Sequence, residues 1–556
     1  MWRRFVRIET GIFLVLWIAL LCAGRSAMLR DPGTFWHVVT GNRILDSGAV
    51  PRTDPFSFTR AGQLWVVDQW LPECAMAAIH RIAGWDGLLL VTAAVLATVY
   101  TWLACRLLRS GLHPLPGGLV LAAAILAGSP QFHVRPLILT LGLQGVVFAW
   151  LIDIEAGRRG RRQLWWLVPL FVIWANCHGG VLAGVGTAGL CVCGWCAAWM
   201  FGKESPVRTA WDALEMLLFL AAMALAMLVN PYGVYLPKEW WETLSMPLQG
   251  IIDEHTPLDF ANATGFVSVA IAVAYLIVLR GTFPRWPRVT WLLPLVWFAL
   301  AIQRVRNVPL MAVTVVVALA DLLPHSRMAE WLSRHDMFSE SQESAKKQLG
   351  DCPDFRPTKM GLSPSRCPDF RPTKAGLPPS QWLKNRLGSI LPLVLPLVVV
   401  IGAFLMQAAG IAMPVAGRGW ARFDPARWPI ELLPQLTEID RANPEGTPIF
   451  NDLNFGGFLI YHTPRLRVFV DDRCSLYGGD FLQTYNDARQ DNPTLLDAWW
   501  QRYRFPYALV ETGGGFDHHL SGSGQWTLLG RTPVATLYQR DLGTSAAERY
   551  TGMGGE

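Results

Sequence analysis

The chain has 556 residues, of which 52% are hydrophobic and 16% are charged, and its mean hydropathy is +0.28. Such a sequence is too apolar and too poor in charge for an ordinary soluble enzyme, so lipid must be much of its solvent. The net charge of +6 does not indicate a nucleic-acid partner, because Lys and Arg lie in short connectors between apolar runs. The charge pattern indicates membrane topology instead.

Apolar runs recur along most of the chain. A spanning helix needs about 20 mostly apolar residues. The first run follows three Arg residues but precedes no small-residue cleavage site, so we interpret it as a signal anchor that is retained. We predict about eleven spans, at residues 11–29, 85–108, 117–130, 136–153, 163–177, 180–201, 213–229, 263–280, 287–303, 305–322 and 388–411.

The basic connectors alternate along the chain with connectors that carry other features. If the N-terminus is cytoplasmic, every short connector rich in Lys or Arg is cytoplasmic too, as the positive-inside rule requires. An odd number of spans then exports the long segments 30–84, 230–262 and 412–556. We therefore predict a multi-pass protein with its N-terminus inside and its C-terminal domain outside.

Residues 323–387 form a polar segment before the last predicted span. The segment is rich in Pro, Ser and Lys, and it contains the octapeptide CPDFRPTK twice, at 352–359 and 367–374. Two copies are too few for a solenoid. We predict a disordered cytoplasmic linker without a catalytic role.

The rest of the chain divides into a membrane part and an exported domain. Residues 1–322 form a multi-span membrane domain that includes the loop 30–84, and residues 388–411 form the last span. In residues 412–556, short strand-like runs flank a helical stretch at 480–502. The predicted fold class is thus an α-helical polytopic membrane protein with a small C-terminal α/β domain.

The first exported loop holds the most informative residues. Asp31 follows the first span and precedes an amphipathic interfacial helix, 35–45, for which Thr34 is a suitable N-cap. A carboxylate in this place can act as a general base for an acceptor hydroxyl, or hold a divalent cation. It can also cap the helix and pair with Arg30 or Arg43, and from the loop alone we favour this structural role.

The loop continues with VPRTDPFSF at 50–58, which brings a second carboxylate, Asp54. Asp-Pro, an aromatic interfacial helix and this motif together resemble the first outer loop of GT-C glycosyltransferases, especially multi-span bacterial relatives of uncharacterised substrate. The loop is also similar to that of the oligosaccharyltransferase catalytic subunit. The resemblance implies that Asp31 is a catalytic carboxylate and that the donor is a sugar on a polyprenyl phosphate. Weaker motifs extend it to 133–136, 176–180, 230–233, 253–257, 306–310, 451–460 and 468–473.

Polar residues at the exported ends of the predicted spans complete the candidate site. Ionisable residues in a membrane are costly, roughly 2.5 to 3.5 kcal/mol each at a helix centre, and usually mark a functional interior. We expect one outward-opening cavity ringed by His133, Arg135, His178, Asn230, Tyr232, Glu254 and Arg306. Snorkelling or structural hydrogen bonding explains each His and Arg equally well. A helix stop explains Asn230 and Tyr232 better than ligand contact does.

The predicted roles follow from this arrangement. Arg135 or Arg306 suits the phosphate of a lipid-linked donor, because a guanidinium binds phosphate in a bidentate manner. The candidate catalytic residues are Asp31 and Asp54, and the candidate donor- or substrate-binding residues are His37, Arg135, His178, Tyr232, Glu254 and Arg306.

No metal site is predicted. Cys191, Cys193 and Cys196 lie within an apolar run and are interpreted as helix-packing residues. Asp471 and Asp472 follow a strand-like run and could bind a cation or sugar hydroxyls, but we favour a salt-bridged strand end that includes Arg473. A divalent cation, Mg²⁺ or Mn²⁺, is compatible with the carboxylates but is not required by the sequence.

The leading hypothesis is a membrane glycosyltransferase that uses a polyprenyl-phosphate-linked sugar on the extracytoplasmic side to modify an envelope glycan, lipid or protein. The resemblance implies an inverting transfer and a bacterial inner (cytoplasmic) membrane. Two alternatives stay open. One is an envelope lipid or polysaccharide transporter, although we find no paired repeats of interrupted helices. The other is a non-catalytic polysaccharide-assembly protein, since Asp68 and Gln69 stand where the relatives more often have His and Glu.

Overall fold

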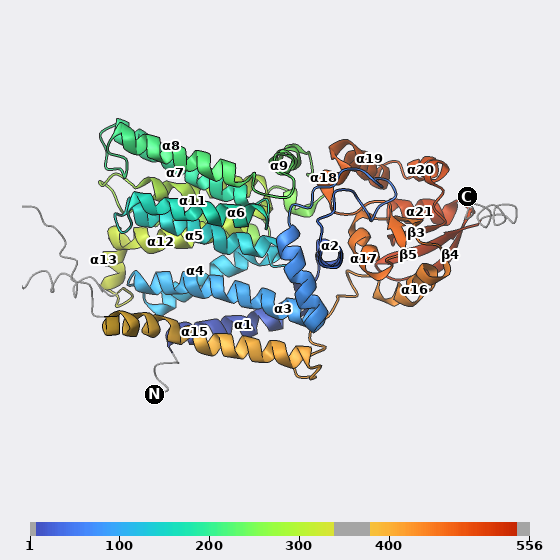
Figure 1. Cartoon of the computed structure of the whole chain (residues 1–556), viewed down its shortest axis with the longest axis horizontal. Helices are drawn as coiled ribbons and strands as arrows, with labels where there is room; N and C mark the ends of the chain where they lie inside the picture. The colour runs from blue at the N-terminus through green and yellow to red at the C-terminus, as the bar shows by residue number, and fades with distance from the viewer. Residues whose placement is uncertain (1–6, 339–378, 542–556) are drawn as a thin grey trace, which may run out of the picture.

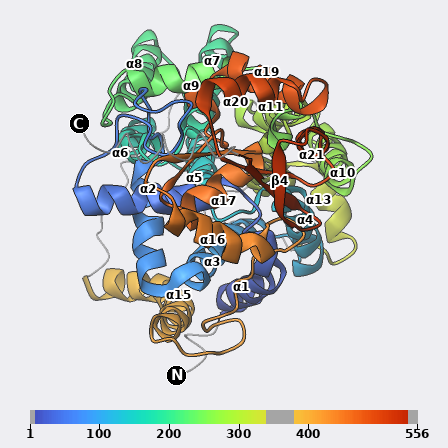
Figure 2. The same ribbon diagram turned by 90° about the vertical axis from the view of Figure 1, so that its right-hand side faces the viewer.

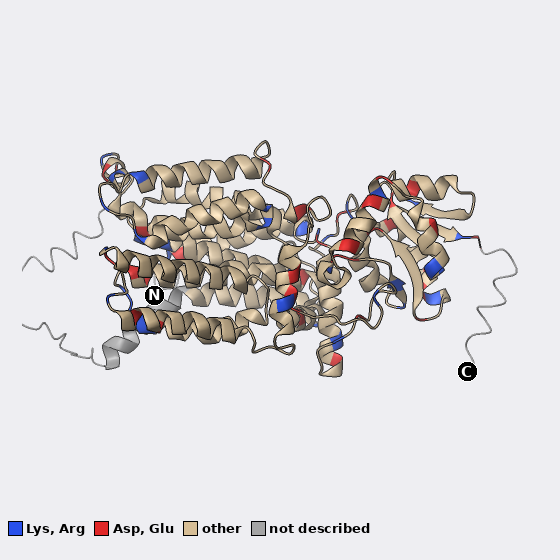
Figure 3. Ribbon diagram, turned by 90° about the horizontal axis from the view of Figure 1, so that it is seen from above, with Lys and Arg blue, Asp and Glu red and all other residues tan. Residues whose placement is uncertain are grey.

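The computed structural model describes residues 7–338 and 379–541. A bundle of roughly parallel helices forms one part, and a small domain with a twisted sheet lies at one end of it (Figure 1). The first helix begins at the opposite end of the bundle from this domain. Acidic and basic residues gather at the two ends of the bundle and on the domain (Figure 3). The predicted fold class is confirmed.

All eleven apolar ranges of the prediction are helical. The corresponding helices are α1 (Ile8–Ala27), α3 (Trp70–Arg109), α4 (Pro114–Gly128), α5 (Leu137–Glu155), α6 (Leu167–Ala175), α7 (Val181–Met200), α8 (Ala210–Ala226), α10 (Ala263–Arg280), α11 (Val289–Gln303), α12 (Val308–Leu322) and α15 (Pro379–Ala408). By length and composition, six helical stretches of the described chain are able to cross a membrane: α1, α3, α5, α7, α10 and Val305–His325.

The two ranges predicted to be shortest are short in the structure. Helix α4 has 15 residues. Helix α6 has 9 residues and is preceded by the 3₁₀ turn η3 (Arg161–Trp166). At about 1.5 Å per residue, neither α4 nor α6 alone covers a hydrocarbon core of about 30 Å. They lie inside the bundle beside longer helices (Figure 1).

Helix α3 is 40 residues long and consists of two helices joined at Gly84, whose backbone has φ 62° and ψ −155°. A residue with a Cβ rarely adopts positive φ, so glycine permits the sharp change of direction. The part after Gly84 corresponds to the predicted span 85–108. The part before it packs on α2 (Gly33–Ser47), the interfacial helix of the first loop.

Helix α2 is held between the bundle and the C-terminal domain. It begins at Gly33, so Thr34 is not its N-cap, and the Thr34 hydroxyl donates to the Val134 carbonyl instead. The Phe35 ring, fully buried, contacts Trp85 of α3 and Phe458 of α17 (Leu453–His462), with ring centroids 5.5 and 5.6 Å apart. One aromatic core therefore includes the loop, the bundle and the domain.

The C-terminal domain contains a five-stranded sheet of order β2-β1-β3-β5-β4. Strand β1 is parallel to β2 and β3, whereas β5 is antiparallel to β3 and β4. Several helices flank the sheet, and the domain covers one end of the bundle (Figure 2). Its elements are α16 (Leu433–Ala442), β1 (Thr447–Asn451), α17, β2 (Leu466–Val468), α18 (Cys474–Tyr477), α19 (Gly479–Gln490), α20 (Leu495–Tyr503), β3 (Tyr507–Glu511), α21 (Gly515–Gly522), β4 (Trp526–Arg531) and β5 (Ala535–Arg540).

The tandem octapeptide lies outside the described residues. The described beginning of the predicted linker contains η6 (Leu323–His325) and the short helix α13 (Arg327–Ser333). Leu332 is buried, and the His113 backbone N–H donates to the Met337 carbonyl, at 2.9 Å. The burial of Leu332 and this backbone hydrogen bond indicate that the stretch packs on the end of the bundle.

Candidate active site

Four charged residues form a continuous chain of contacts where the bundle meets the C-terminal domain. Arg135 precedes α5, and its Nη1 donates a 2.8 Å hydrogen bond to Asp31 Oδ2. The same nitrogen lies 3.6 Å from Glu254 in η4 (Asp253–His255). Glu254 in turn lies 3.7 Å from Nη1 of Arg306 in η5 (Val305–Asn307). The structure thus brings together Asp31, Arg135, Glu254 and Arg306, which the sequence analysis placed around one cavity.

Both oxygens of Asp31 are engaged. Oδ2 accepts from Arg135, and Oδ1 accepts from the Gly33 backbone N–H at 2.8 Å. The structural alternative expected Arg30 or Arg43 as the partner of Asp31. Arg30 pairs with Asp424 instead, at 2.8 Å. Asp31 therefore belongs to the charged chain that crosses the site.

Neighbouring charges in this chain of contacts shift the pKa values of Glu254 and Arg135. Burial acts to raise the pKa of Glu254, but Arg306 and Arg135 outweigh it and lower that pKa to about 2. Burial acts to lower the pKa of Arg135, whereas Asp31 and Glu254 raise it above its ordinary value. Glu254 and Arg135 are therefore both ionised at neutral pH. Arg306 is the most exposed member, at 27%, and is the most available to a new anion.

The predicted histidines nearby are neutral. His178 Nδ1 accepts a 2.8 Å hydrogen bond from the Gly180 N–H, so Nε2 carries its proton. Burial and the charge of Arg306 lower the pKa of His178 to about 3. Arg306 Nη1 lies 2.7 Å from His255 Nε2, which must accept because a guanidinium only donates. Burial and Arg306 lower the pKa of His255 to about 4, and burial also lowers that of His133.

His37 is completely buried on α2. Its Nδ1 lies 2.7 Å from Glu73 Oε1, and its Nε2 has no hydrogen-bond partner among the described residues. Burial is the main cause that lowers the pKa of His37 well below its ordinary value, and the charge of Arg135 adds to it. His37 is therefore a neutral imidazole beside the charged chain.

The C-terminal domain adds Asp472, for which binding of a cation or of sugar hydroxyls was the less favoured prediction and a salt-bridged strand end the favoured one. Asp472 Oδ1 accepts a 2.7 Å hydrogen bond from Trp36 Nε1 on α2. A Cβ placed on Gly33 would lie 2.8 Å from Asp31 Oδ1, 3.0 Å from Asp472 Oδ2 and 3.4 Å from His37 Nε2. Three polar atoms from three segments therefore converge beside Gly33. Burial and the neighbouring Asp31 raise the pKa of Asp472 to about 7, against the opposite effect of Arg135.

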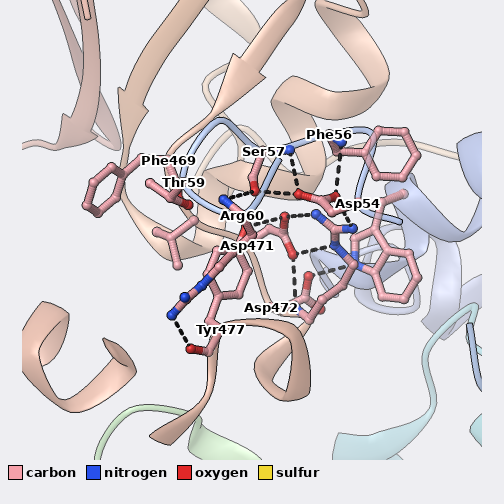
Figure 4. Close-up of polar contacts among 12 residues, drawn as sticks. Asp54, Phe56, Ser57, Thr59, Arg60, Phe469, Asp471, Asp472 and Tyr477 are labelled. Atoms are coloured by element: carbon pink, nitrogen blue, oxygen red, sulfur yellow. Dashed lines mark hydrogen bonds and ion pairs between the residues drawn. The ribbon is translucent and has the colours of Figure 1, made fainter. Parts of the chain in front are cut away.

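Asp54, predicted to be catalytic, is a buried partner of Arg473. Its carboxylate accepts 3.0 Å hydrogen bonds from the N–H groups of Phe56 and Ser57, and Oδ1 lies 2.7 Å from Arg473 Nη1 (Figure 4). Arg473 also pairs with Asp471 at 2.7 Å. Because both oxygens of Asp54 are engaged inside the protein, these contacts favour a structural role over the predicted catalytic one.

Tyr232 and Asn230 also have structural partners. The Tyr232 hydroxyl donates to the Pro51 carbonyl at 2.5 Å and accepts from the Val67 N–H at 3.1 Å, so it connects two parts of the first loop. Asn230 Nδ2 donates to the Met227 and Gly233 carbonyls, as expected for a helix stop followed by a turn. For these two residues the geometry favours the structural interpretation.

A cavity of about 440 Å³ lies next to the charged chain. It lies between the segment that follows α9 (Tyr235–Ser245) and helix α19 of the C-terminal domain. His255, which contacts Arg306, lines this cavity, and so does Arg304. The lining residues are Met246, Pro247, Leu248, Gln249, His255, Arg304 and Gln483.

Among the described residues, no group of three or more His, Cys, Asp or Glu side chains is arranged to hold a metal ion. Cys191 is buried, Cys196 is half-buried and Cys193 is exposed, and all three are free thiols on α7. Their positions on one apolar helix fit the predicted packing role. The carboxylates of the site interact mainly with arginines.

Neither a family model nor a curated protein matches the sequence. Among solved structures, the chain is similar to ArnT from Cupriavidus metallidurans, a GT-C glycosyltransferase. The TM-score is 0.46 for the crystal structure bound to undecaprenyl phosphate and 0.49 for the apo structure. Each shares 13% identity, over 96% of this chain and 97% of that chain.

Proposed function

We propose that the chain is a membrane glycosyltransferase that uses a polyprenyl-phosphate-linked sugar on the extracytoplasmic side to modify an envelope glycan, lipid or protein. The observation that carries the proposal is the chain of contacts from Asp31 through Arg135 and Glu254 to Arg306. It combines an anionic carboxylate with two guanidinium groups at the end of a membrane bundle. Lipid-linked sugar phosphates need these two kinds of group, one for the acceptor and one for the phosphate.

Arg306 is the residue best placed to bind the donor phosphate. It is partly exposed, its contact with Glu254 is loose at 3.7 Å, and its partner His255 lines the adjacent cavity. A phosphate in the cavity replaces the weak Glu254 contact by charge-assisted hydrogen bonds. When the sugar is transferred, the leaving phosphate gains negative charge, which a fixed guanidinium stabilises.

Asp31 is held more firmly than Arg306. Arg135 and the Gly33 N–H fix both of its oxygens, and its side chain is only 11% exposed. A carboxylate held in this way orients an acceptor hydroxyl without changing its own position. Asp31 thereby sets the direction from which the acceptor attacks the sugar.

The proposed location is a bacterial inner (cytoplasmic) membrane, with the C-terminal domain on the outer side. Two connectors at the other end of the bundle, 156–160 and 201–209, carry Arg158, Arg159, Lys203 and Arg208. The positive-inside rule then favours the cytoplasm for that end. The site opens toward the outer compartment in this orientation, where lipid-linked sugars and envelope acceptors meet.

The test compares wild type with Asp31→Asn, using purified full-length protein in lipid vesicles and a panel of undecaprenyl-phosphate sugars. The wild type is expected to release undecaprenyl phosphate, and the substitution to lower the rate by about 10²-fold, because the acceptor loses its orientation. Asp46→Asn is the matched control, since Asp46 lies on α2, the helix that follows Asp31, and is 69% exposed. A wild type that turns over no donor but moves the lipid across the vesicle contradicts the proposal and supports a transporter.

A further inference from the structure

We propose that Asp472, supplied by the C-terminal domain, accepts the proton of the attacking hydroxyl, and that Asp31 orients this hydroxyl without deprotonating it. The inference rests on the proposed function and assigns the base within the same site. Asp472 comes from a segment 436 residues away from its partner Trp36 on α2. The site is therefore incomplete without the C-terminal domain.

The two carboxylates differ in their hydrogen bonding. Asp31 accepts from Arg135 through Oδ2 and from the Gly33 N–H through Oδ1, so both of its oxygens are already engaged. Asp472 uses only Oδ1, which accepts from Trp36. Within the described part of the chain, Asp472 Oδ2 has no hydrogen-bond partner, so it is free to receive a proton.

Polar atoms of three residues converge beside Gly33. Asp472 Oδ2 and Asp31 Oδ1 lie 3.0 and 2.8 Å from the position of a Gly33 Cβ, and His37 Nε2 lies 3.4 Å from it. His37 is fully buried, and its Nε2 lacks a partner among the residues described. A buried nitrogen without a partner costs free energy that a hydroxyl-bearing ligand recovers. The orienting and the accepting carboxylate therefore both border the space next to Gly33, where we place the acceptor hydroxyl.

The charges around Asp472 also suit a base. Burial and Asp31 raise its pKa to about 7, and Asp471 acts in the same direction, whereas Arg135 opposes them. The other titratable groups that face it are His37, which is neutral, and Cys474, whose pKa is raised by burial. A general base works best when its pKa is near the working pH. Asp472 meets this condition in addition to having the free oxygen.

The proton of the acceptor hydroxyl passes to Asp472 Oδ2, and the acceptor oxygen forms a bond to the anomeric carbon of the donor. The bond between that carbon and the phosphate oxygen breaks, and its electron pair leaves with the polyprenyl phosphate. Arg306 faces the additional negative charge of this leaving group. The protonated Asp472 then releases its proton to water, because its side chain is only partly buried.

The position of Asp472 depends on its two neighbours in the chain. Asp471 and Arg473 form the buried network with Asp54, so the loop after β2 is fixed on both sides of Asp472. Asp471 and Arg473 therefore fix the position of Asp472, which is not itself part of their salt-bridge network.

The experiment uses Asp472→Asn in the full-length protein, with kcat and KM measured against pH for the undecaprenyl-phosphate sugar that the wild type turns over. Asparagine keeps the oxygen that accepts from Trp36 but cannot accept a proton. We expect kcat to fall by about 10²- to 10⁴-fold with little change in KM for the donor. The wild-type kcat is expected to rise with pH and to level off near the pKa of Asp472, about 7, whereas the residual kcat of the variant lacks this rise.

Asp472→Glu is expected to recover part of the activity and its pH dependence. Asp480→Asn is the matched control, because Asp480 is exposed on α19 of the same domain, and it should behave as wild type. If the wild type turns over the donor and Asp31→Asn does not, but Asp472→Asn keeps the wild-type rate and pH profile, the assignment of Asp472 is wrong while the proposed function stands. An unchanged pH profile with a raised KM gives Asp472 a structural role and also overturns the inference. No turnover by any protein rejects the proposed function itself.

Discussion

Arg473 and Asp54 form an ion pair with a nitrogen–oxygen distance of 2.7 Å, and their side chains are 2% and 0% exposed. The two residues are 419 positions apart in the sequence. Asp54 lies between α2 and α3, in the first loop (30–84) that also contains Asp31, and Arg473 belongs to the C-terminal domain. This ion pair therefore connects the C-terminal domain to the loop that contains Asp31.

Asp54→Asn is expected to destabilise the protein by about 3–5 kcal/mol, because it leaves the Arg473 charge buried without its full complement of partners. Thermal unfolding in detergent and limited proteolysis between α15 and α16 measure the effect. Asp46→Asn is the control, since its exposed pair with Arg81 contributes about 0–1 kcal/mol. Equal unfolding temperatures for the two variants would contradict the anchoring role of the buried pair.

Gly33→Ala is expected to lower donor turnover by about 10²-fold while the protein stays folded. The new Cβ would lie within 3.0 Å of both Asp31 and Asp472, and these side chains can move away without backbone changes. Rates are compared with those of Gly11→Ala on α1, where a Cβ meets no atom within 4 Å. Wild-type turnover in Gly33→Ala would show that the space beside this glycine is not used.

Arg306→Gln is expected to raise KM for the donor by about 10- to 100-fold. The reason is that the variant loses a charge-assisted hydrogen bond to the phosphate, which contributes about 1.5–3 kcal/mol. Steady-state kinetics with the undecaprenyl-phosphate sugar measure the change. Arg334→Gln serves as the control, because Arg334 is exposed just after α13, which packs at the other end of the bundle. An unchanged KM in Arg306→Gln would place the phosphate elsewhere.

The pH dependence of stability provides a further test of the charged chain. The folded pKa of Glu254 is about 2, below its ordinary value of 4.5, so its ionised form stabilises the fold. This contribution is fully present above about pH 4.5 and is lost as the pH falls toward 2. Wild type should therefore lose stability more steeply than Glu254→Gln over this range in thermal unfolding. Parallel slopes for the two proteins would contradict the ion pairs.

The sequence predicts the helices well because lipid demands long apolar runs, and each predicted run is helical. It also predicts that four charged residues lie close together, because all of them lie at the exported ends of the predicted spans. These residues are Asp31, Arg135, Glu254 and Arg306. Alternation of apolar residues is likewise sufficient to locate the strands of the C-terminal domain. These features depend on local patterns.

The sequence does not predict contacts that depend on how the C-terminal domain is docked. Asp54 looks like a second catalytic carboxylate until its pairing with Arg473 is known. Asp472 is predicted to belong to a salt-bridged strand end. In the structure its neighbours Asp471 and Arg473 form the salt bridge, whereas Asp472 faces Asp31. The only signal for this was its place in the 468–473 motif, directly after a strand.

The most direct measurement is an experimental map of the protein in a lipid nanodisc with undecaprenyl phosphate bound. The account predicts that the phosphate lies against Arg306, beside His255 in the cavity between the bundle and the C-terminal domain, with Asp31 and Asp472 on the side of the acceptor. A phosphate bound at the opposite end of the bundle, or away from both Arg135 and Arg306, would contradict the account.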